Sequence, residues 1–241
     1  LLGHFYLDLF PRDGKYGHAA AFGLIDGRVM PDGSYRTPLN VMVANFTKPT
    51  KNSPALLGHN EVTTFFHEFG HVMHLLLSKP VYAQQSGYGV AWDFVEAPSQ
   101  MLENWAWQPK VLKTISAHYK TGEPLPDEMI KNMIDAKYLH VGVSYSRQIL
   151  YGLMNHYFHT RQNVDTTALI NELWKDIALT DSQAGTHMQA SFGHLINYDA
   201  AYYTYLWSEV FSADMFSRFE KEGPLNKATG YAYRKAVLEP G

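Results

Sequence analysis

Five consecutive residues of this chain combine two histidines with a glutamate in a spacing that suits metal-assisted hydrolysis. The sequence is His67-Glu68-Phe69-Gly70-His71. In a helix, His67 and His71 lie one turn apart on the same face, so both imidazoles can bind one metal ion. Zn²⁺ suits such a pair because it accepts imidazole and carboxylate ligands in a tetrahedral site. Glu68 can then reach a water at the metal and act as a general base.

The same pattern also occurs by chance in helices that bind no metal, so the surrounding sequence has to be weighed. Apolar residues on both sides predict a well-packed helix over residues 60–78, with Asn60 as its N-terminal cap and Pro80 beyond its end. Gly70 is unfavourable inside a helix by about 1 kcal/mol relative to alanine. A glycine at this position therefore indicates that another segment comes close to the helix.

A catalytic zinc site needs a third protein ligand and an open position. Glu96 is the best candidate, near the start of a helix predicted over residues 93–107. Asp93 can cap that helix, and Pro98 falls near its first turn, where a missing N–H costs least. Glu103 lies on the same helical face as Glu96 and can orient a ligand histidine. The alternative for Glu103 is an ordinary surface carboxylate. One turn beyond His71, His74 is expected to pack or to form a hydrogen bond.

Composition limits the classes of function. The chain has 241 residues, of which 46% are hydrophobic and 18% charged, and its net charge is −3. These values are typical of a globular protein and give no basic excess that would favour nucleic acid or anionic lipid. No apolar stretch reaches the roughly 18 residues of a membrane span. There is no cysteine, which excludes thiolate chemistry and is compatible with a cytoplasmic protein. We expect a cytoplasmic monomer.

The elements that position these residues divide into strands near the N-terminus and a longer helical part. Alternating residues predict a half-buried strand over residues 3–10, and further strands are predicted over 18–24 and 39–46. Helical patterns continue over residues 110–119, 127–161 with a break near Gly142, 166–179, 198–220 and 227–238. We expect an α+β fold, mostly helical, with a small sheet near the N-terminus, as one catalytic domain over residues 1–241.

Several separate motifs, in the same order, resemble the thimet oligopeptidase and neurolysin family of zinc peptidases. They are Gly14-Lys15-Tyr16-Gly17-His18, residues 67–74, residues 93–105, Ser191-Phe192-Gly193-His194, residues 198–209 and the closing Leu238-Glu239-Pro240-Gly241. The resemblance implies a helical body that lines a substrate channel, one zinc ion at the channel floor, and short peptides as substrates. It implies that His67, His71 and Glu96 bind the zinc and that Glu68 is the catalytic base.

The resemblance also assigns roles to residues near the second half of the chain. It places transition-state tyrosines at Tyr198, Tyr202 and Tyr205, and a substrate-binding histidine at His194. The spacing puts these tyrosines on one face of the predicted helix over residues 198–220, where phenol groups can donate to a developing oxyanion. On sequence alone, an aromatic core stripe is the alternative.

Two departures from the family bear on substrate binding. After His194 the loop has the sequence Leu195-Ile196-Asn197 and lacks the usual glycines, and Thr204 replaces a small glycine. The family also carries a long helical N-terminal region, and Leu1 is not an initiator methionine. We therefore expect the catalytic part of a longer protein, with a complete zinc site and an incomplete channel.

The type of cleavage stays open at the level of the sequence. The motif Leu102-Glu103-Asn104-Trp105 is closer to the endopeptidases of the family, so we expect cuts inside short peptides. A peptidyl-dipeptidase shares the same zinc core. A zinc-binding fragment with little activity and a metal-dependent hydrolase of substrates other than peptides are also compatible with these residues.

Overall fold

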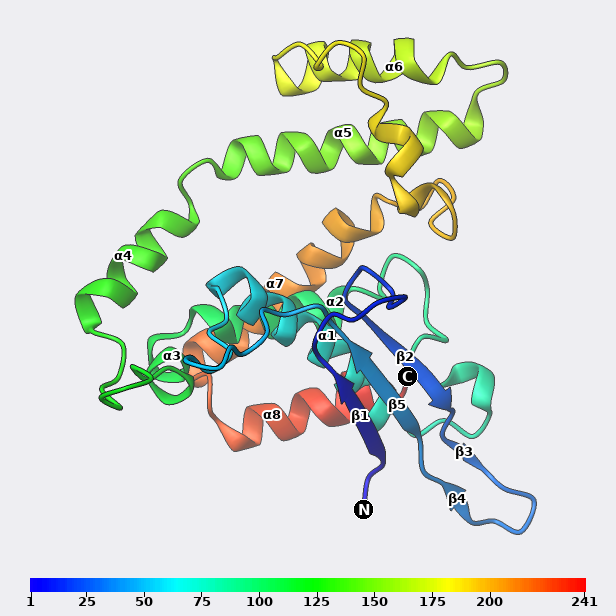
Figure 1. The fold of residues 1–241 in the computed structure, drawn as a ribbon. Helices are drawn as coiled ribbons and strands as arrows, with labels where there is room; N and C mark the ends of the chain where they lie inside the picture. Colours follow the sequence, from blue (N-terminus) through cyan, green and yellow to red (C-terminus); the bar gives the residue numbers. More distant parts are fainter. The chain divides into compact units, whose positions relative to one another are not determined.

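The computed structural model describes residues 1–241, and the chain divides into two compact units (Figure 1). The first unit combines Leu1–Ile130 with Ser208–Gly241, and the second is Lys131–Trp207. The chain leaves the first unit within helix α4 (Asp127–Lys137) and returns to it within helix α7 (Thr204–Glu222). Secondary structure is α+β and mostly helical, as predicted. No helix is both long enough and apolar enough to pass through a bilayer.

A three-stranded sheet opens the first unit. Its order is β1 (His4–Asp8), β5 (Leu39–Val43) and β2 (Ala20–Ile25), with β1 parallel and β2 antiparallel to β5. All three predicted strands are present. A short ribbon of β3 (Arg28–Val29) and β4 (Tyr35–Arg36) was not predicted. The half-buried character predicted for the first strand is wrong, because β1 is an edge strand that adds no residue to the buried core cluster.

Helix α1 (His59–Leu77) packs against this sheet (Figure 1). The buried residues between them are Ala21, Met42, Ala44, Phe46, Val72 and Leu75. The helix follows Gly58, whose N–H donates to the Glu61 carboxylate at 2.8 Å. The N–H of Thr47 donates to the same carboxylate at 2.7 Å. The prediction that Asn60 caps the helix is therefore wrong, since Asn60 is already helical and Glu61 binds the chain ahead of it.

Helix α2 (Ala97–Glu103) continues into a single 3-10 turn at Asn104–Trp107. The prediction that Asp93 caps this helix is wrong, because residues 92–96 form turns and the helix begins after Glu96. Pro98 lies in the first turn, as predicted. Helices α3 (Pro109–Ile115) and α8 (Lys227–Tyr233) complete the unit. Helix α8 continues into a π-helical turn over Arg234–Leu238. A second cluster packs α2 against α7 through Met101, Phe216 and Phe219.

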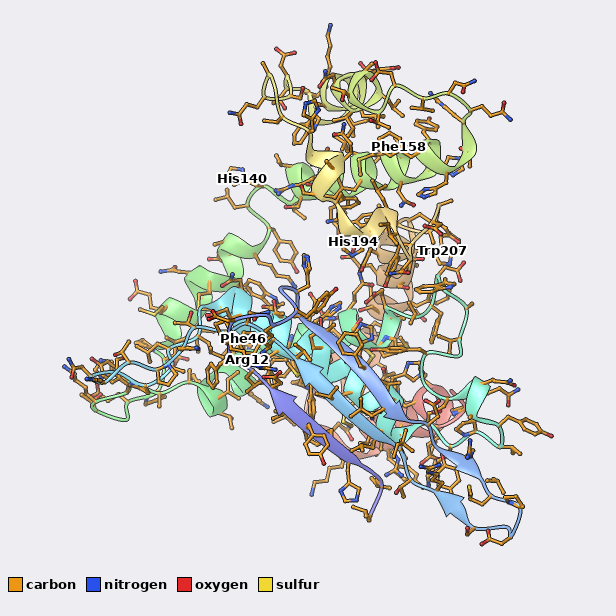
Figure 2. The ribbon with its side chains drawn as sticks, turned by 45° about the vertical axis from the view of Figure 1, so that its right-hand side comes forward. Arg12, Phe46, His140, Phe158, His194 and Trp207 are labelled. Carbon is orange, nitrogen blue, oxygen red and sulfur yellow. The ribbon has the colours of Figure 1, made fainter.

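The second unit is built on α5 (Val141–Thr160) and α6 (Thr166–Leu173). Their shared core consists of Leu150, Met154, Leu169, Ile170 and Leu173. Asp165 caps α6 by accepting hydrogen bonds from the N–H groups of Thr167 and Ala168. The predicted break in the long helix is present close to Gly142, where His140 adopts a left-handed φ of 70° (Figure 2). Helix α6 continues into a π-helical turn over Trp174–Ala178.

The start of α7 differs from its prediction. The aromatic spacing predicts a helix from residue 198, but α7 begins at Thr204. Asn197 and Ala200 have φ values of 83° and 56°, which a right-handed helix does not allow. The preceding segment contains only short 3-10 turns at Met188–Ser191 and Gly193–Leu195. Tyr198 and Tyr202 therefore lie in turns ahead of the helix.

Candidate active site

Three predicted ligands come together in the first unit. His67 and His71 lie on α1 with ring centroids 5.0 Å apart, and Glu96 directly precedes α2. Oε2 of Glu96 is 3.3 Å from Nε2 of His67 and 3.0 Å from Nε2 of His71. The ligand atoms of the three residues all lie within 4.8 Å of one another. Two imidazoles and one carboxylate thus converge on a point where they could hold a metal ion.

Gly70 explains how Glu96 reaches the two histidines. A Cβ atom at Gly70 would lie 2.6 Å from Cα of Ser99 and 2.7 Å from the carbonyl oxygen of Pro98. Both contacts are too close for any side chain, so only glycine lets the first turn of α2 cross α1 here. The predicted close approach to Gly70 is confirmed, and its partner is the segment that carries Glu96.

Two further side chains hold the converging residues in place. Oε1 of Glu103 lies 2.7 Å from Nδ1 of His67, which leaves Nε2 of that ring facing Glu96. Ser99 donates from its hydroxyl to Oε2 of Glu96 at 2.9 Å. The contact of Glu103 with a ligand histidine was predicted, whereas the role of Ser99 was missed. Its position three residues after Glu96, in the first turn of a helix, was the available signal.

The buried carboxylate of Glu96 lies against two imidazole rings. Glu96 is only 3% exposed, and burial alone would raise its pKa. The imidazoles of His71 and His67 instead hold the pKa of Glu96 well below its usual range. Burial likewise opposes the charged form of His67, but Glu103 and Glu96 raise the pKa of His67 to about 10. The cluster therefore favours a cation where its ligand atoms meet.

Glu68 lies beside these residues and is 6% exposed. Burial raises the pKa of its carboxyl group, although His67 and His71 oppose the shift. The backbone of Ala21 on β2 lies beside this carboxylate and also opposes the upward shift of its pKa. This contact was not predicted, because it joins residues far apart in sequence. A carboxylate with a raised pKa, buried beside three candidate metal ligands, is suited to accept a proton.

His74 behaves as a packing residue, in agreement with one of the two roles expected. Its side chain is fully buried, and neither ring nitrogen has a hydrogen-bond partner. Burial lowers the pKa of His74 to about 4, and His71 adds to the shift. The ring is therefore neutral at physiological pH.

The second unit contains the predicted histidine and tyrosines as one aromatic cluster. The ring centroid of His194 lies 5.2 Å from that of Tyr198, 5.3 Å from that of Tyr202 and 5.7 Å from that of Tyr205. Nε2 of His194 is 3.1 Å from the Tyr205 hydroxyl. The prediction that the three tyrosines share one helical face is wrong, because only Tyr205 lies on α7. The turns ahead of α7 nevertheless bring the four rings together. Figure 2 labels His194, in the 3-10 turn Gly193–Leu195, and Trp207, in the first part of α7.

Comparison with known proteins identifies the family. A profile of Peptidase family M3 matches residues 1–241. This chain belongs to peptidase family M3. It is 49% identical to thimet-like oligopeptidase of Dictyostelium discoideum, over all of this chain and 37% of that relative. It is 45% identical to saccharolysin of Saccharomyces cerevisiae and 41% identical to oligopeptidase A of Escherichia coli, covering 35% and 36% of those proteins.

The fold is also shared with a solved peptidase structure. "PZ peptidase A with inhibitor 2" matches with a TM-score of 0.59 and 13% identity, over 95% of this chain and 36% of that one. At this identity the likeness concerns the fold alone. The chain thus spans little more than a third of the curated relatives that it matches. The resemblance to this family, predicted from the motifs, is confirmed, while the roles of single residues stay predictions.

Proposed function

We propose that this chain carries the zinc-dependent active site of an oligopeptidase, which hydrolyses peptide bonds in short peptides. One observation carries the proposal: His67, His71 and Glu96 converge around one point, with Glu68 buried beside them. Membership of peptidase family M3 supports it, as do the names of the relatives, which are oligopeptidases.

The three ligand residues fit one zinc ion of the catalytic type. Two imidazole nitrogens and one carboxylate oxygen form a set of three protein ligands, which leaves a fourth position for water or substrate. A structural zinc would need four protein ligands. Zinc in this site would polarise the scissile carbonyl and make a water molecule more acidic. Glu103 and Ser99 would keep the imidazole of His67 and the carboxylate of Glu96 in the binding geometry.

Glu68 is proposed as the general base. Its carboxylate would take a proton from the attacking water and later give that proton to the leaving amine. The raised pKa makes the first transfer easier than for an ordinary glutamate, because the protonated form is less costly in a buried site.

The aromatic cluster is proposed to act on the substrate. Tyr205 would donate from its phenol to the oxyanion of the tetrahedral intermediate, with help from Tyr198 or Tyr202. His194, whose Nε2 contacts the Tyr205 hydroxyl, would bind substrate and orient that phenol.

The substrate channel, a monomeric state and a cytoplasmic location remain part of the proposal. The relatives named mitochondrial intermediate peptidases are 35% identical or less.

The test is cleavage of a mixed set of short peptides, followed by mass spectrometry. The protein is compared as isolated, after chelation, and after zinc is restored. We expect cleavage that chelation abolishes and zinc recovers. Cuts inside the peptides would identify an endopeptidase, and release of C-terminal dipeptides a peptidyl-dipeptidase. Cleavage that persists in full after complete zinc removal, or hydrolysis of esters but of no peptide, would refute the proposal.

A further inference from the structure

The aromatic cluster depends on a turn that its own sequence disfavours. Between His194 and Tyr205 the chain contains two residues other than glycine with left-handed φ, Asn197 at 83° and Ala200 at 56°. Left-handed backbone costs a residue such as alanine roughly 1–2 kcal/mol. The segment also lacks regular secondary structure from Ile196 to Tyr203. Contacts from elsewhere in the second unit must therefore hold it in the observed conformation.

Asn155 on α5 contacts the backbone of this part of the chain at two points, His194 and Tyr202. Its side chain is fully buried. Nδ2 of Asn155 donates to the carbonyl oxygen of His194 at 3.3 Å, and Oδ1 accepts from the N–H of Tyr202 at 3.2 Å. One amide thus fixes the backbone of two members of the aromatic cluster at the same time. No glutamate, lysine or apolar side chain of similar size offers a donor and an acceptor in this way.

His159 lies one helical turn after Asn155 and contacts the same segment. Its Nδ1 is 2.7 Å from the carbonyl oxygen of Asn155, and its Nε2 is 3.2 Å from the carbonyl oxygen of Leu195. The same Nε2 lies 3.5 Å from the carboxylate of Asp199. The ring therefore joins α5 to the residue after His194 and to the residue after Tyr198.

We propose that Asn155 and His159 are positioning residues that hold the segment from His194 to Tyr205 in its catalytic conformation. They act through that segment and do not touch the reacting atoms. The role in catalysis rests on the proposed function, whereas the holding of the segment does not. Because a displacement of about 1 Å in a catalytic group can cost roughly 100-fold in rate, a modest loosening of the turn should be measurable.

The first experiment replaces Asn155 in the zinc-loaded protein. Asn155→Leu keeps the size and removes both hydrogen bonds. Asn155→Asp keeps the acceptor for the Tyr202 N–H and loses the donor to His194. We expect Asn155→Leu to lower kcat about 10- to 100-fold with little change in KM or zinc content. Asn155→Asp should keep more of the activity than Asn155→Leu. A folded Asn155→Leu protein with wild-type kcat would overturn the proposal.

The histidines of α5 provide a matched pair on the same helix. His159→Ala removes the contacts with Leu195 and Asp199. His156→Ala removes an exposed ring that packs against its neighbour Tyr157. We expect a lower kcat for His159→Ala and wild-type kcat for His156→Ala. Equal effects of the two substitutions would contradict the assignment.

Hydrogen exchange separates this proposal from the proposed function, because it needs no turnover. In Asn155→Leu and His159→Ala, amides of residues 194–205 should exchange faster than in wild type, while those in His156→Ala should not. Unchanged exchange in the first two variants would refute the proposal even if peptides are cleaved. Faster exchange in a protein that cleaves nothing would support the holding contacts and refute the proposed function alone.

A double-mutant cycle with Tyr205→Phe then tests whether Asn155 affects kcat through Tyr205. If Asn155 acts by placing this cluster, Asn155→Leu should cost much less in the Tyr205→Phe background than in wild type. The same fold-loss in both backgrounds would show that Asn155 does not act through the tyrosine.

Discussion

Replacing Gly70 with alanine should weaken zinc binding without touching any ligand. The added Cβ would lie 2.6 Å from Cα of Ser99 and 2.7 Å from the carbonyl oxygen of Pro98, roughly 1 Å inside the optimal separation of non-bonded atoms. Both neighbours are backbone atoms, so the first turn of α2 has to move by a similar distance. Glu96 directly precedes that turn and would move with it. Metal sites tolerate deviations of only about 0.2 Å in ligand distance, so we expect zinc affinity to fall roughly 10- to 100-fold.

Two opposing effects set the free energy of unfolding of Gly70→Ala. Alanine improves helix propensity by about 1 kcal/mol, whereas overpacking costs about 1–3 kcal/mol. We therefore expect a net effect between almost none and about 2 kcal/mol of destabilisation. Gly152→Ala is the matched control on α5, because a Cβ there meets no atom within 4 Å. That change should stabilise the protein by about 0.5–1 kcal/mol and leave zinc affinity unchanged.

The assays are competition with a fluorescent zinc chelator and thermal unfolding of the zinc-free protein. They compare wild type, Gly70→Ala and Gly152→Ala. Wild-type zinc affinity in Gly70→Ala would refute the idea that glycine at this crossing places Glu96.

Three further outcomes follow from the contacts. Glu103→Ala removes the partner of His67 Nδ1 and should weaken zinc binding about 10- to 100-fold in the same competition assay. Tyr205→Phe should lower kcat for peptide cleavage about 100-fold or more with zinc content unchanged, and wild-type kcat would exclude an oxyanion role. Burial opposes ionisation of Glu61, but the N–H groups of Gly58 and Thr47 outweigh it and lower its pKa. Its stabilising effect is therefore present at neutral pH and lost as the pH falls through that lowered pKa. Glu61→Ala should cost on the order of 1 kcal/mol at neutral pH, and the difference from wild type should shrink in acid unfolding curves.

Local patterns predicted well that His67, His71 and Glu96 come together. The positions of His67 and His71 follow from helical spacing, and Gly70 pointed to a close crossing that brings Glu96 to them. The spacing of Glu96 and Glu103 was enough to predict that Glu103 contacts one of the two histidines, although α2 begins only after Glu96. These predictions depend on short sequence separations within two helices, where backbone geometry leaves few possible arrangements.

The remaining errors concern contacts that spacing does not encode. The tyrosine spacing predicted a helix from residue 198, but left-handed Asn197 and Ala200 delay α7 to Thr204. Tyr198, Tyr202 and Tyr205 come together through turns ahead of α7. Asn155, which lies on α5, forms hydrogen bonds with the backbone of these turns. The contact between Ala21 and Glu68 likewise joins a strand to a helix much further along the chain. Asn60 and Asp93 were plausible caps by residue type, but tertiary contacts set the helix starts elsewhere.

Glu68→Gln provides the most direct test of the central claim, that three ligands bind the zinc while Glu68 moves the proton. Zinc content and single-turnover peptide cleavage are measured on the same sample of this variant and of wild type. We predict one zinc per chain in both proteins and a loss of cleavage by at least about 100-fold in the variant. Cleavage at the wild-type rate by the zinc-loaded variant, or loss of the zinc itself, would contradict that division of roles.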